Sequence, residues 1–361
     1  MLEKENVSNI DNSKENIKFM HRCLQLAKLG RGTAQPNPMV GSVVVYNGEI
    51  IGEGYHHKCG QAHAEVNAIN SVKDKTLLKN STIYVNLEPC AHVGRTPACS
   101  TLIINSKIPR VVIGCVDSFD KVAGQGIQML EKAGVDVEVG VLEQESWWLN
   151  RRFFTFHQKK RPYIILKWAE TKDGFIDYDR SKEKPKAAWI TNELSRAYVH
   201  KWRTEEPAFL VGTQTALKDN PQLNVRVWSG TVPLRVSVDR EGVFPEDLHL
   251  LDDSQPTLIF TSELPTNKLN NTDFVLIDKS QSLEQQILDE LYKREIQSLV
   301  VEGGQIVLDS FISANLWDEA RVFTGDKIFK SGTNAPAFKY SISETYQLED
   351  TELAFYYNVL G

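Results

Sequence analysis

Three side chains that commonly bind metals occur within the first hundred residues: His63, Cys90 and Cys99. Eight residues separate the two cysteines. Two thiolates and one imidazole would give a tetrahedral zinc three protein ligands and leave one position for water, which is typical of a catalytic site. Zinc lowers the pKa of a bound water from about 15.7 to roughly 7. The set therefore predicts hydrolytic chemistry at a zinc ion.

Glu65 follows His63 by two residues, so its carboxylate can face the water without binding the metal. Water attack on a ring carbon that carries an amino group needs a side chain that moves a proton to the leaving ammonia. His-Ala-Glu followed by Pro-Cys is typical of zinc deaminases that act on nucleobases. Deaminases of free cytidine or of polynucleotides usually have two residues between the cysteines, so a spacing of eight favours another substrate. A structural zinc with Cys59 or His92 as fourth ligand is the alternative.

The bulk composition excludes several classes of protein. The chain has 361 residues, which favours two domains. Its formal net charge is −6, so no basic excess is present to attract a nucleic acid. No apolar run reaches the length of a membrane span, and residues 1–15 lack the apolar stretch of a secretory signal. Five cysteines, an odd number, do not suggest a disulfide framework, and we expect a reducing, cytoplasmic setting.

The first half alternates strands with helices, which predicts an α/β layered domain over residues 17–150. Asn47-Gly48 is a strong signal for a two-residue hairpin turn. We expect the polar residues 1–16 to form a flexible extension. The predicted strands are 42–46, 49–54, 81–87, 110–116 and 135–141. The predicted helices are 17–29, 62–71, 126–133 and one opened by Pro97, with Cys99 on its first turn.

A second α/β series follows a charged, proline-terminated boundary near residues 149–160 and predicts a domain over 160–361. Gly303-Gly304 comes after a strand and opens a helix, where backbone N–H groups can approach a phosphate. A plain tight turn is the alternative, and the missing GxGxxG pattern argues against a conventional Rossmann site. The predicted strands are 163–168, 208–212, 234–239, 257–260, 274–277 and 298–302, and the predicted helices are 192–203, 282–295 and 305–314.

Longer motifs point to a family. The first half contains Pro36-Asn37-Pro38-Met39-Val40-Gly41, Gly52-Glu53-Gly54-Tyr55-His56, the His-Ala-Glu triplet, Leu87-Glu88-Pro89-Cys90-Ala91-His92-Val93-Gly94-Arg95-Thr96-Pro97-Ala98-Cys99 and Val122-Ala123-Gly124-Gln125-Gly126. The second half contains Lys167, Asp173-Gly174, Trp189-Ile190-Thr191, Asp219-Asn220-Pro221-Gln222-Leu223-Asn224-Val225-Arg226 and Val301-Glu302-Gly303-Gly304. This set closely resembles the bifunctional riboflavin-biosynthesis deaminase/reductase family.

The resemblance implies both activities. A zinc-dependent deaminase half would remove the ring amino group of 2,5-diamino-6-(5-phosphoribosylamino)pyrimidin-4(3H)-one. A reductase half would use NADPH to open and reduce the ribose to a ribityl chain. It also implies a cytidine-deaminase-like three-layer fold for the first domain and a dihydrofolate-reductase-like α/β fold for the second. We expect a homo-oligomer that binds a phosphorylated pyrimidine and neither nucleic acid nor membrane.

The resemblance extends to individual positions in both halves. It implies that Asp219 assists proton transfer beside the cofactor. Guanidinium groups bind phosphate through paired hydrogen bonds, which favours Arg203 and Arg226 for the substrate phosphate, although solvated charge is their alternative. The implied NADPH-binding residues are Ala169, Trp189, Thr215, Asp219, Gly303 and Gly304, and the implied substrate-binding residues are Asn37, Arg203, Leu223, Arg226 and Glu302.

Some positions depart from the family pattern. These include Gln35, Cys59, Gln61, residues 117–120, Phe175 and Ala187, where the family has a serine that would contact substrate. Several touch the reductase pocket and none touches the zinc set. One alternative is therefore a deaminase whose second domain is a scaffold. A zinc-stabilised nucleotide-binding regulator and a polynucleotide editor are two others; Glu65 argues against the first, and the acidic charge argues against the second.

Overall fold

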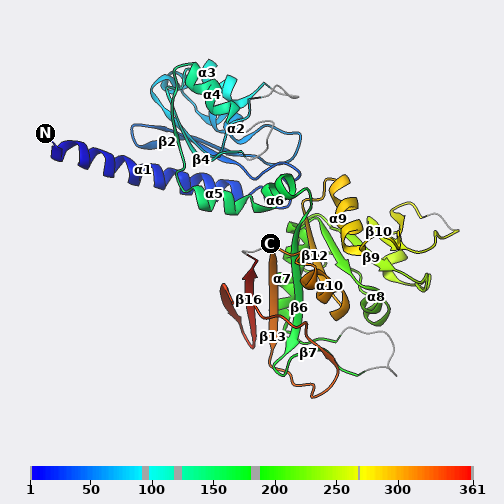
Figure 1. Cartoon of the computed structure of the whole chain (residues 1–361). Helices are drawn as coiled ribbons and strands as arrows, with labels where there is room; N and C mark the ends of the chain where they lie inside the picture. The colour runs from blue at the N-terminus through cyan, green and yellow to red at the C-terminus, as the bar shows by residue number, and fades with distance from the viewer. Residues whose placement is uncertain (1, 92–96, 118–123, 180–187, 267–268, 359–361) are drawn as a thin grey trace. The chain divides into compact units, whose positions relative to one another are not determined.

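The computed structural model describes the chain except residues 1, 92–96, 118–123, 180–187, 267–268 and 359–361. Two compact units, Met1–Lys160 and Arg161–Gly361, make up the molecule (Figure 1). The boundary predicted near 149–160 is helical: α5 covers Glu143–Leu149 and α6 covers Arg151–Lys159. Phe154 of α6 is fully buried, because an amphipathic helix rather than a solvated linker occupies this stretch.

The first unit contains a five-stranded sheet in the order β2-β1-β3-β4-β5. β1 is antiparallel to β2 and β3, whereas β3, β4 and β5 are parallel. Asn47 and Gly48 both have positive φ (49° and 77°), as a hairpin of the predicted kind requires. The strands are β1 Gly41–Tyr46, β2 Glu49–Tyr55, β3 Thr82–Leu87, β4 Arg110–Cys115 and β5 Asp136–Val139.

Helices cover both faces of this sheet, which gives three layers. Alternate strand residues face opposite layers: Val44 and Ile83 pack with α2, α3 and α4, whereas Val43 and Tyr84 pack with α1. The helices are α1 Leu2–Lys28, α2 Ala64–Ser71, α3 Cys99–Asn105 and α4 Gln125–Lys132, with the 3-10 turn η1 Lys75–Asn80. The layered architecture agrees with the sequence prediction.

The first helix is longer than the sequence predicts, because α1 begins at Leu2 rather than near residue 17. Asn16, which the prediction assigns to a flexible extension, is only 2% exposed. Its amide donates to Glu138 Oε2 at 2.8 Å, and its Oδ1 accepts the Tyr84 hydroxyl at 2.9 Å. The polar composition of this stretch hides a helix that contacts the sheet at its last turns.

The second unit is built on a nine-stranded sheet in the order β11-β10-β9-β8-β12-β6-β13-β16-β15. β11 through β13 in this order are parallel, and β16 and β15 add antiparallel strands at one edge. The strands are β6 Tyr163–Thr171, β8 Ala208–Val211, β9 Leu234–Asp239, β10 Thr257–Thr261, β11 Thr272–Leu276, β12 Ser298–Gly303, β13 Glu319–Gly325, β15 Glu344–Leu348 and β16 Thr351–Tyr357.

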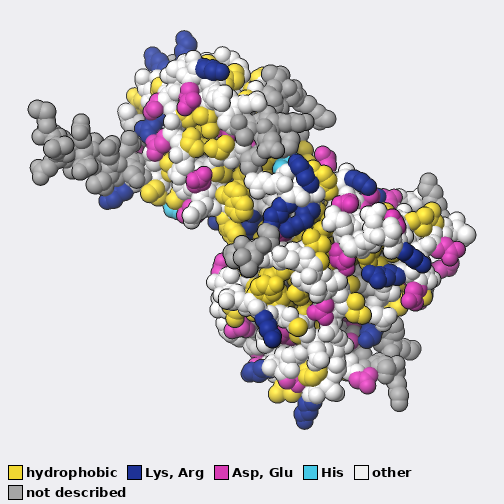
Figure 2. All heavy atoms as spheres, viewed as in Figure 1, with side chains coloured by type: hydrophobic (Ala, Val, Ile, Leu, Met, Phe, Trp, Pro, Cys, Tyr) yellow, Lys and Arg dark blue, Asp and Glu magenta, His cyan; other side chains and the backbone are white. Residues whose placement is uncertain are grey.

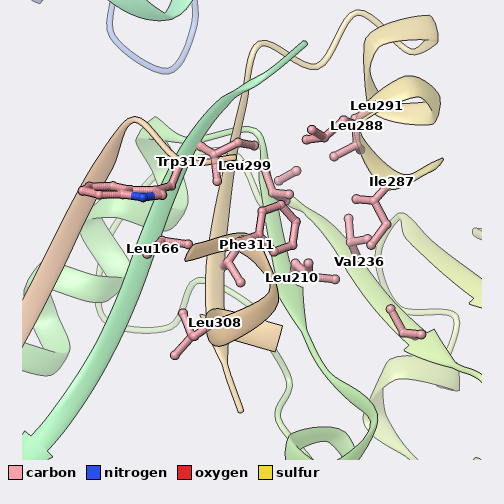
Figure 3. Packing of buried hydrophobic residues seen from close by; sticks show 14 of the residues in the cluster. Leu166, Leu210, Val236, Ile287, Leu288, Leu291, Leu299, Leu308, Phe311 and Trp317 are labelled. Atoms are coloured by element: carbon pink, nitrogen blue, oxygen red, sulfur yellow. The ribbon is translucent and has the colours of Figure 1, made fainter. Parts of the chain in front are cut away.

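Two hydrophobic cores lie on opposite faces of this sheet. On one face α9 and α10 direct Ile287, Leu288, Leu291 and Phe311 onto Leu210 and its strand neighbours (Figure 3). On the other face α7 and α8 pack against Phe209, Val300 and Phe323. The helices are α7 Glu193–Glu205, α8 Thr213–Asp219, α9 Leu283–Lys293 and α10 Gln305–Ser313, with the 3-10 turn η2 His249–Leu251.

Several elements of the second unit have no counterpart in the sequence prediction. Strands β13, β15 and β16 follow the last predicted helix, and α8 lies between predicted strands. A short antiparallel pair, β7 Phe175–Asp177 with β14 Thr333–Asn334, forms a separate two-stranded sheet. β7, β14 and β15 have two to five residues, and such short segments carry weak periodicity. β13, β16 and α8 have seven residues each, so length does not explain why the sequence analysis misses them.

Candidate active sites

The three predicted zinc ligands meet at one end of the first sheet. His63 is the N-cap of α2, Cys99 is the first residue of α3, and Cys90 follows the end of β3. His63 Nδ1 lies 3.7 Å from Cys90 Sγ and 3.4 Å from Cys99 Sγ. All three ligand atoms lie within 4.8 Å of one another. The starts of α2 and α3 therefore direct the His63 imidazole and the Cys99 thiol toward the Cys90 thiol, which follows the end of β3.

The spacing of these atoms fits a zinc ion. A zinc about 2.0 Å from an imidazole nitrogen and about 2.3 Å from a thiolate requires a nitrogen–sulfur separation of about 3.6 Å in tetrahedral geometry. The two observed separations lie on either side of that value. Cys59 is exposed and lies outside this cluster, and His92 lies outside the described residues. Within the described part of the chain, the cluster supplies three ligands and leaves the fourth position for water.

The surroundings of Cys90 favour its thiolate, which is the form that binds zinc. Hydrogen bonding from the Cys99 thiol lowers the pKa of Cys90, and His63 adds to this effect while burial opposes it. The Cys99 backbone N–H also donates to Cys90 Sγ at 3.3 Å. The first turn of α3 therefore provides one ligand and stabilises the charge of the other.

Glu65 occupies the first turn of α2 and is 3% exposed. Burial raises the pKa of Glu65 to about 7, and the Cys90 charge adds to the rise. A carboxyl with a pKa near neutrality both accepts and returns a proton readily. The position beside the ligand cluster fits the proton carrier that the sequence predicts.

Asn37 is oriented by a histidine that the sequence analysis does not assign. Asn37 Nδ2 lies 3.0 Å from His56 Nε2, and His56 Nδ1 lies 3.1 Å from the Ala62 carbonyl oxygen. Burial lowers the pKa of His56, so its neutral form donates through Nδ1 to that carbonyl and accepts the Asn37 amide at Nε2. This pairing fixes which way the Asn37 carboxamide points.

Two asparagines far along the chain hold the segment that follows Asn37. Asn150 accepts the Met39 N–H at 2.8 Å and donates to the Met39 carbonyl at 2.9 Å. Asn86 accepts the Gly41 N–H at 2.8 Å and also donates to the Met39 carbonyl, at 3.2 Å. Both asparagines are 2% exposed or less, so the segment is tied to the core on two sides.

The second unit contains a cavity of about 580 Å³ at the carboxyl ends of its parallel strands. Neighbouring strands β6, β12, β8 and β9 end in this cavity, which is where parallel sheets commonly bind ligands. Among the predicted cofactor residues, the cavity wall includes Ala169, Thr215, Asp219, Gly303 and Gly304. Trp189 is 48% exposed and is not part of that wall, although Ala188 and Ile190 are.

The two glycines at the junction of β12 and α10 have backbone conformations that side chains rarely adopt. Gly303 has φ of 152° and Gly304 has φ of 48°. A Cβ on Gly304 would approach the Thr215 hydroxyl to 3.1 Å. Gly304 is the N-cap of α10, so its neighbourhood presents free backbone N–H groups. The glycines thus keep a helix start accessible to a phosphate, as the sequence analysis proposes.

Glu302 joins this cavity to the predicted substrate residues. Its Oε2 accepts Arg203 Nη2 at 3.0 Å, and both side chains are about nine-tenths buried. Burial would raise the pKa of Glu302, but the charges of Arg203 and Lys167 outweigh it and lower the pKa. Burial lowers the pKa of Lys167. Glu302 Oε1 and Arg203 Nε are buried and have no hydrogen-bond partner among the described residues, so the pair retains polar capacity toward a ligand.

The segment from Gln222 to Arg226 lies against the same ion pair. Arg203 Nη1 donates to the Asn224 carbonyl at 3.2 Å, and Arg226 Nη1 donates to Gln222 and Asn224 side-chain oxygens. Leu223 has φ of 49° and a 2% exposed side chain within a hydrophobic core. A substrate would therefore meet the backbone of Leu223 rather than its side chain.

His200 supports this segment from α7. The Arg226 backbone N–H donates to His200 Nδ1 at 3.3 Å. Burial, together with the charges of Arg203 and Arg226, lowers the pKa of His200 to about 4. His56, His200, Asn86 and Asn150 escape assignment from the sequence because their partners are many residues away. Lys167, like His56, enters the sequence analysis only as part of a motif and has no role assigned to it.

Comparison with known proteins identifies the family of the chain. Residues 162–352 match the model of the RibD C-terminal domain, and residues 13–115 match that of the cytidine and deoxycytidylate deaminase zinc-binding region. The riboflavin biosynthesis protein RibD of Aquifex aeolicus is 42% identical over 319 residues, which cover 87% of this chain and 88% of the relative. The chain belongs to the RibD family.

The similarity covers both halves. The RibD of Escherichia coli is 34% identical over 343 residues, covering 87% of this chain and 88% of that protein. A crystal structure of the diaminohydroxyphosphoribosylaminopyrimidine deaminase/5-amino-6-(5-phosphoribosylamino)uracil reductase from Thermotoga maritima has a TM-score of 0.87 and 37% identity, and covers 96% of this chain and 99% of that one. The RibD chain thus combines a cytidine-deaminase-like unit that uses zinc with a dihydrofolate-reductase-like unit that uses NADPH in riboflavin biosynthesis.

Proposed function

We propose that the first unit hydrolyses the ring amino group of 2,5-diamino-6-(5-phosphoribosylamino)pyrimidin-4(3H)-one with His63, Cys90 and Cys99 as zinc ligands. The convergence of these three side chains beside buried Glu65 carries the proposal. When bound, zinc acidifies water and supplies a nucleophile near neutral pH. The reaction consumes one water and forms a carbon–oxygen bond at the ring carbon. The bond between that carbon and its exocyclic amino nitrogen breaks, and ammonia is released.

Glu65 moves the proton in this proposal. Its carboxylate takes a proton from the water and passes it to the departing amino nitrogen, and its pKa of about 7 suits both transfers. Asn37, held by His56, presents its carboxamide oxygen to a hydrogen-bond donor of the pyrimidine ring. Donation of one Asn37 amide hydrogen to His56 orients the carboxamide and leaves its oxygen available to the ligand.

For the second unit we propose that the cavity holds NADPH with its phosphates near Gly303 and Gly304. NADPH supplies the two electrons and the hydrogen that reduce the ribosyl carbon. Asp219 and Glu302 line the same wall, and Asp219 is the carboxyl group that the family resemblance implies for proton transfer, while Glu302 is implied for substrate binding. Arg203 and Arg226 would bind the substrate phosphate, because guanidinium groups form paired hydrogen bonds with phosphate. Both guanidinium groups donate to Asn224, so they lie near each other. The roles of Ala169, Trp189, Thr215 and Leu223 remain predictions from the family resemblance.

The alternative of a non-catalytic second unit is not favoured. The RibD C-terminal domain model matches 162–352, and the cavity, buried ion pair and glycine turn are all present. A zinc-stabilised regulator would have no use for Glu65 buried at the ligand cluster. The polynucleotide editor is opposed by the net charge of −6, and Figure 2 shows acidic and basic side chains interspersed on the visible face.

The setting of the enzyme is proposed from its cysteines. All five are free of disulfides, which supports the expectation of a reducing, cytoplasmic compartment. No described helix has the combination of length and apolar character that crossing a bilayer requires. A homo-oligomer remains a prediction.

Product analysis tests the proposed function. The purified chain is given the diaminopyrimidine phosphate with and without NADPH, and the products are identified by mass. Without NADPH the deaminated ribosyl compound and one equivalent of ammonia are expected, and with NADPH the ribityl compound. Ammonia release without any reduction of the deaminated compound, together with failure to bind NADPH, would leave only the deaminase half of the proposal standing.

A further inference from the structure

Glu88 is a buried carboxylate that the mechanism above does not use. It directly follows β3, is 5% exposed and precedes the zinc ligand Cys90 by two residues. Its own backbone N–H donates to the Cys115 carbonyl at the end of β4 at 3.0 Å. A charged side chain at such a buried position requires several hydrogen-bond donors to offset the loss of water.

Within the described part of the chain, four backbone N–H groups supply those donors. Oε1 accepts from Gly126 at 2.9 Å and Ile127 at 3.3 Å, in the first turn of α4. Oε2 accepts from Asp117 at 3.2 Å and Gly124 at 3.0 Å, the residues on either side of 118–123, which lie outside the described part of the chain. One side chain thus joins the end of β3, the segment after β4 and the start of α4.

The two residues after Glu88 are held by the same elements. Gly126 lies so close to Pro89 that a Cβ at Gly126 would stand 2.0 Å from the Pro89 carbonyl oxygen. The Cys90 carbonyl accepts the Ser100 hydroxyl at 2.7 Å and the Ser100 N–H at 3.2 Å. The Ser100 hydroxyl also lies 3.5 Å from Met129 Sδ of α4. The backbone that carries Cys90 is therefore packed between α3 and α4.

We propose that Glu88 is a positioning residue for the zinc site: by fixing α4 against the Glu88–Cys90 backbone, it sets where the Cys90 thiolate lies relative to His63 and Cys99. The inference rests on the ligand set proposed above. Groups that hold metal ligands in place typically change metal affinity or activity by about 10–100-fold when they are replaced.

Glu88→Gln tests this geometry with little change in volume. One amide oxygen can still accept two of the N–H groups, but the NH₂ group then opposes the other two, so donors face donors. We expect the full-length variant to bind zinc about 10–100-fold more weakly, measured by competition with a chelator. The spectrum of the cobalt-substituted variant should also change, because it reports the arrangement of thiolate and imidazole ligands.

Two further variants provide the controls. Glu138→Gln makes the same chemical change in the same unit, on β5, where Glu138 contacts Asn16 and Arg110 away from the zinc ligands. It should bind zinc as the original chain does. Cys90→Ala removes a proposed ligand and should lose high-affinity zinc. Reduction of the deaminated substrate measures the amount of folded second unit in every preparation, and hydrogen exchange at the amides of residues 41–46 and 82–87 reports whether the first unit is folded.

The outcomes separate the inference from the proposed function. If Cys90→Ala binds zinc normally, the ligand set is wrong; if it loses zinc while Glu88→Gln keeps normal affinity and spectrum, only the role of Glu88 is wrong. Should Glu88→Gln leave the first unit unfolded, Glu88→Asp replaces it, keeping the charge but withdrawing it by one methylene. A folded Glu88→Asp with normal zinc affinity, or failure of both variants to fold, would overturn the positioning role.

Discussion

The two proposed active sites of this chain are assembled in different ways. In the deaminase unit, His63 and Cys99 lie at helix starts and Cys90 lies just past a strand end, all within a span of 37 residues. In the reductase unit, the central ion pair joins Arg203 of α7 to Glu302 of β12, 99 residues apart, and the cavity wall draws on four strand ends. One site is local in sequence and the other is a product of topology.

This difference has an energetic side. The deaminase site is held mainly by backbone donors, so its geometry depends on where helices begin. The reductase site depends on buried charges that must be matched: the charges of Arg203 and Lys167 lower the pKa of Glu302 against the effect of burial. A single substitution should therefore act on chemistry in the first site and on both stability and binding in the second.

Zinc removal should produce the largest difference between the activities of the two units. Treatment of the full chain with a strong chelator should reduce ammonia release to background, because the proposed nucleophile depends on the metal. Reduction of the deaminated substrate by NADPH should continue unchanged, since the second unit has its own cavity and ligands. Added zinc should restore deamination. A parallel loss of both activities would show that the sites are not separable in this way.

Glu65→Gln should affect only the first reaction, and nearly as strongly. The amide has the same shape but cannot carry a proton, so ammonia release should fall by about 10²–10⁴-fold. Zinc content, measured by elemental analysis, should stay the same because Glu65 is not a ligand. Glu53→Gln, at an exposed carboxylate paired with Arg22, serves as the matched control. A wild-type rate of deamination in Glu65→Gln would show that Glu65 is not the proton carrier.

The local site was also the one that the sequence could predict. His63, Glu65, Cys90 and Cys99 were all named from residue type and spacing, and the structure brings the three ligands together. The layered fold of the first unit follows from its strand–helix alternation. What the sequence could not reveal is the support: Glu88, His56 and Asn150 find their partners 19 to 111 residues away.

The second unit was predicted less completely for a physical reason. Its predicted strands are present, but the sequence does not predict strands β13 and β16, the edge strand β15 or helix α8. β15 is largely exposed and lacks the apolar pattern of a buried strand. The pairing of Arg203 with Glu302 required knowledge that α7 and β12 are neighbours, which periodicity does not give. The family resemblance indicates Arg203 and Glu302 as site residues. From residue chemistry alone, Arg203 could equally be a solvated surface charge.

Breaking the buried pair should test the dependence on matched charge. Arg203→Met leaves Glu302 without its ionic partner in a site about nine-tenths buried. The second unit should lose about 3–5 kcal/mol of unfolding free energy, measured in urea, and reductase activity should fall. Deamination should be retained at temperatures where the first unit stays folded.

A matched arginine on the surface calibrates that effect. Arg294→Met removes a guanidinium whose side chain is 33% exposed and pairs with Asp273 and Glu290 at the surface. Because exposed ion pairs are screened by water, its effect on stability should be much smaller than that of Arg203→Met. Equal losses in the two variants would mean that burial of the Arg203–Glu302 pair does not set its importance.

The smallest effect expected is a change in acid sensitivity through His200. Its pKa falls from 6.5 to about 4 because of burial and the charges of Arg203 and Arg226, with Glu302 opposing. Between these values the unfolded chain binds a proton that the folded one does not, so stability above pH 6.5 is lost as pH falls toward 4. His200→Asn keeps an acceptor for the Arg226 N–H and should lose less stability between pH 7.5 and 5, measured as the urea concentration that halves NADPH binding. His249→Asn, at a histidine with a 42% exposed side chain in the same unit, should behave like the original chain. An unchanged acid response in His200→Asn would mean that other groups of the reductase unit set its pH dependence.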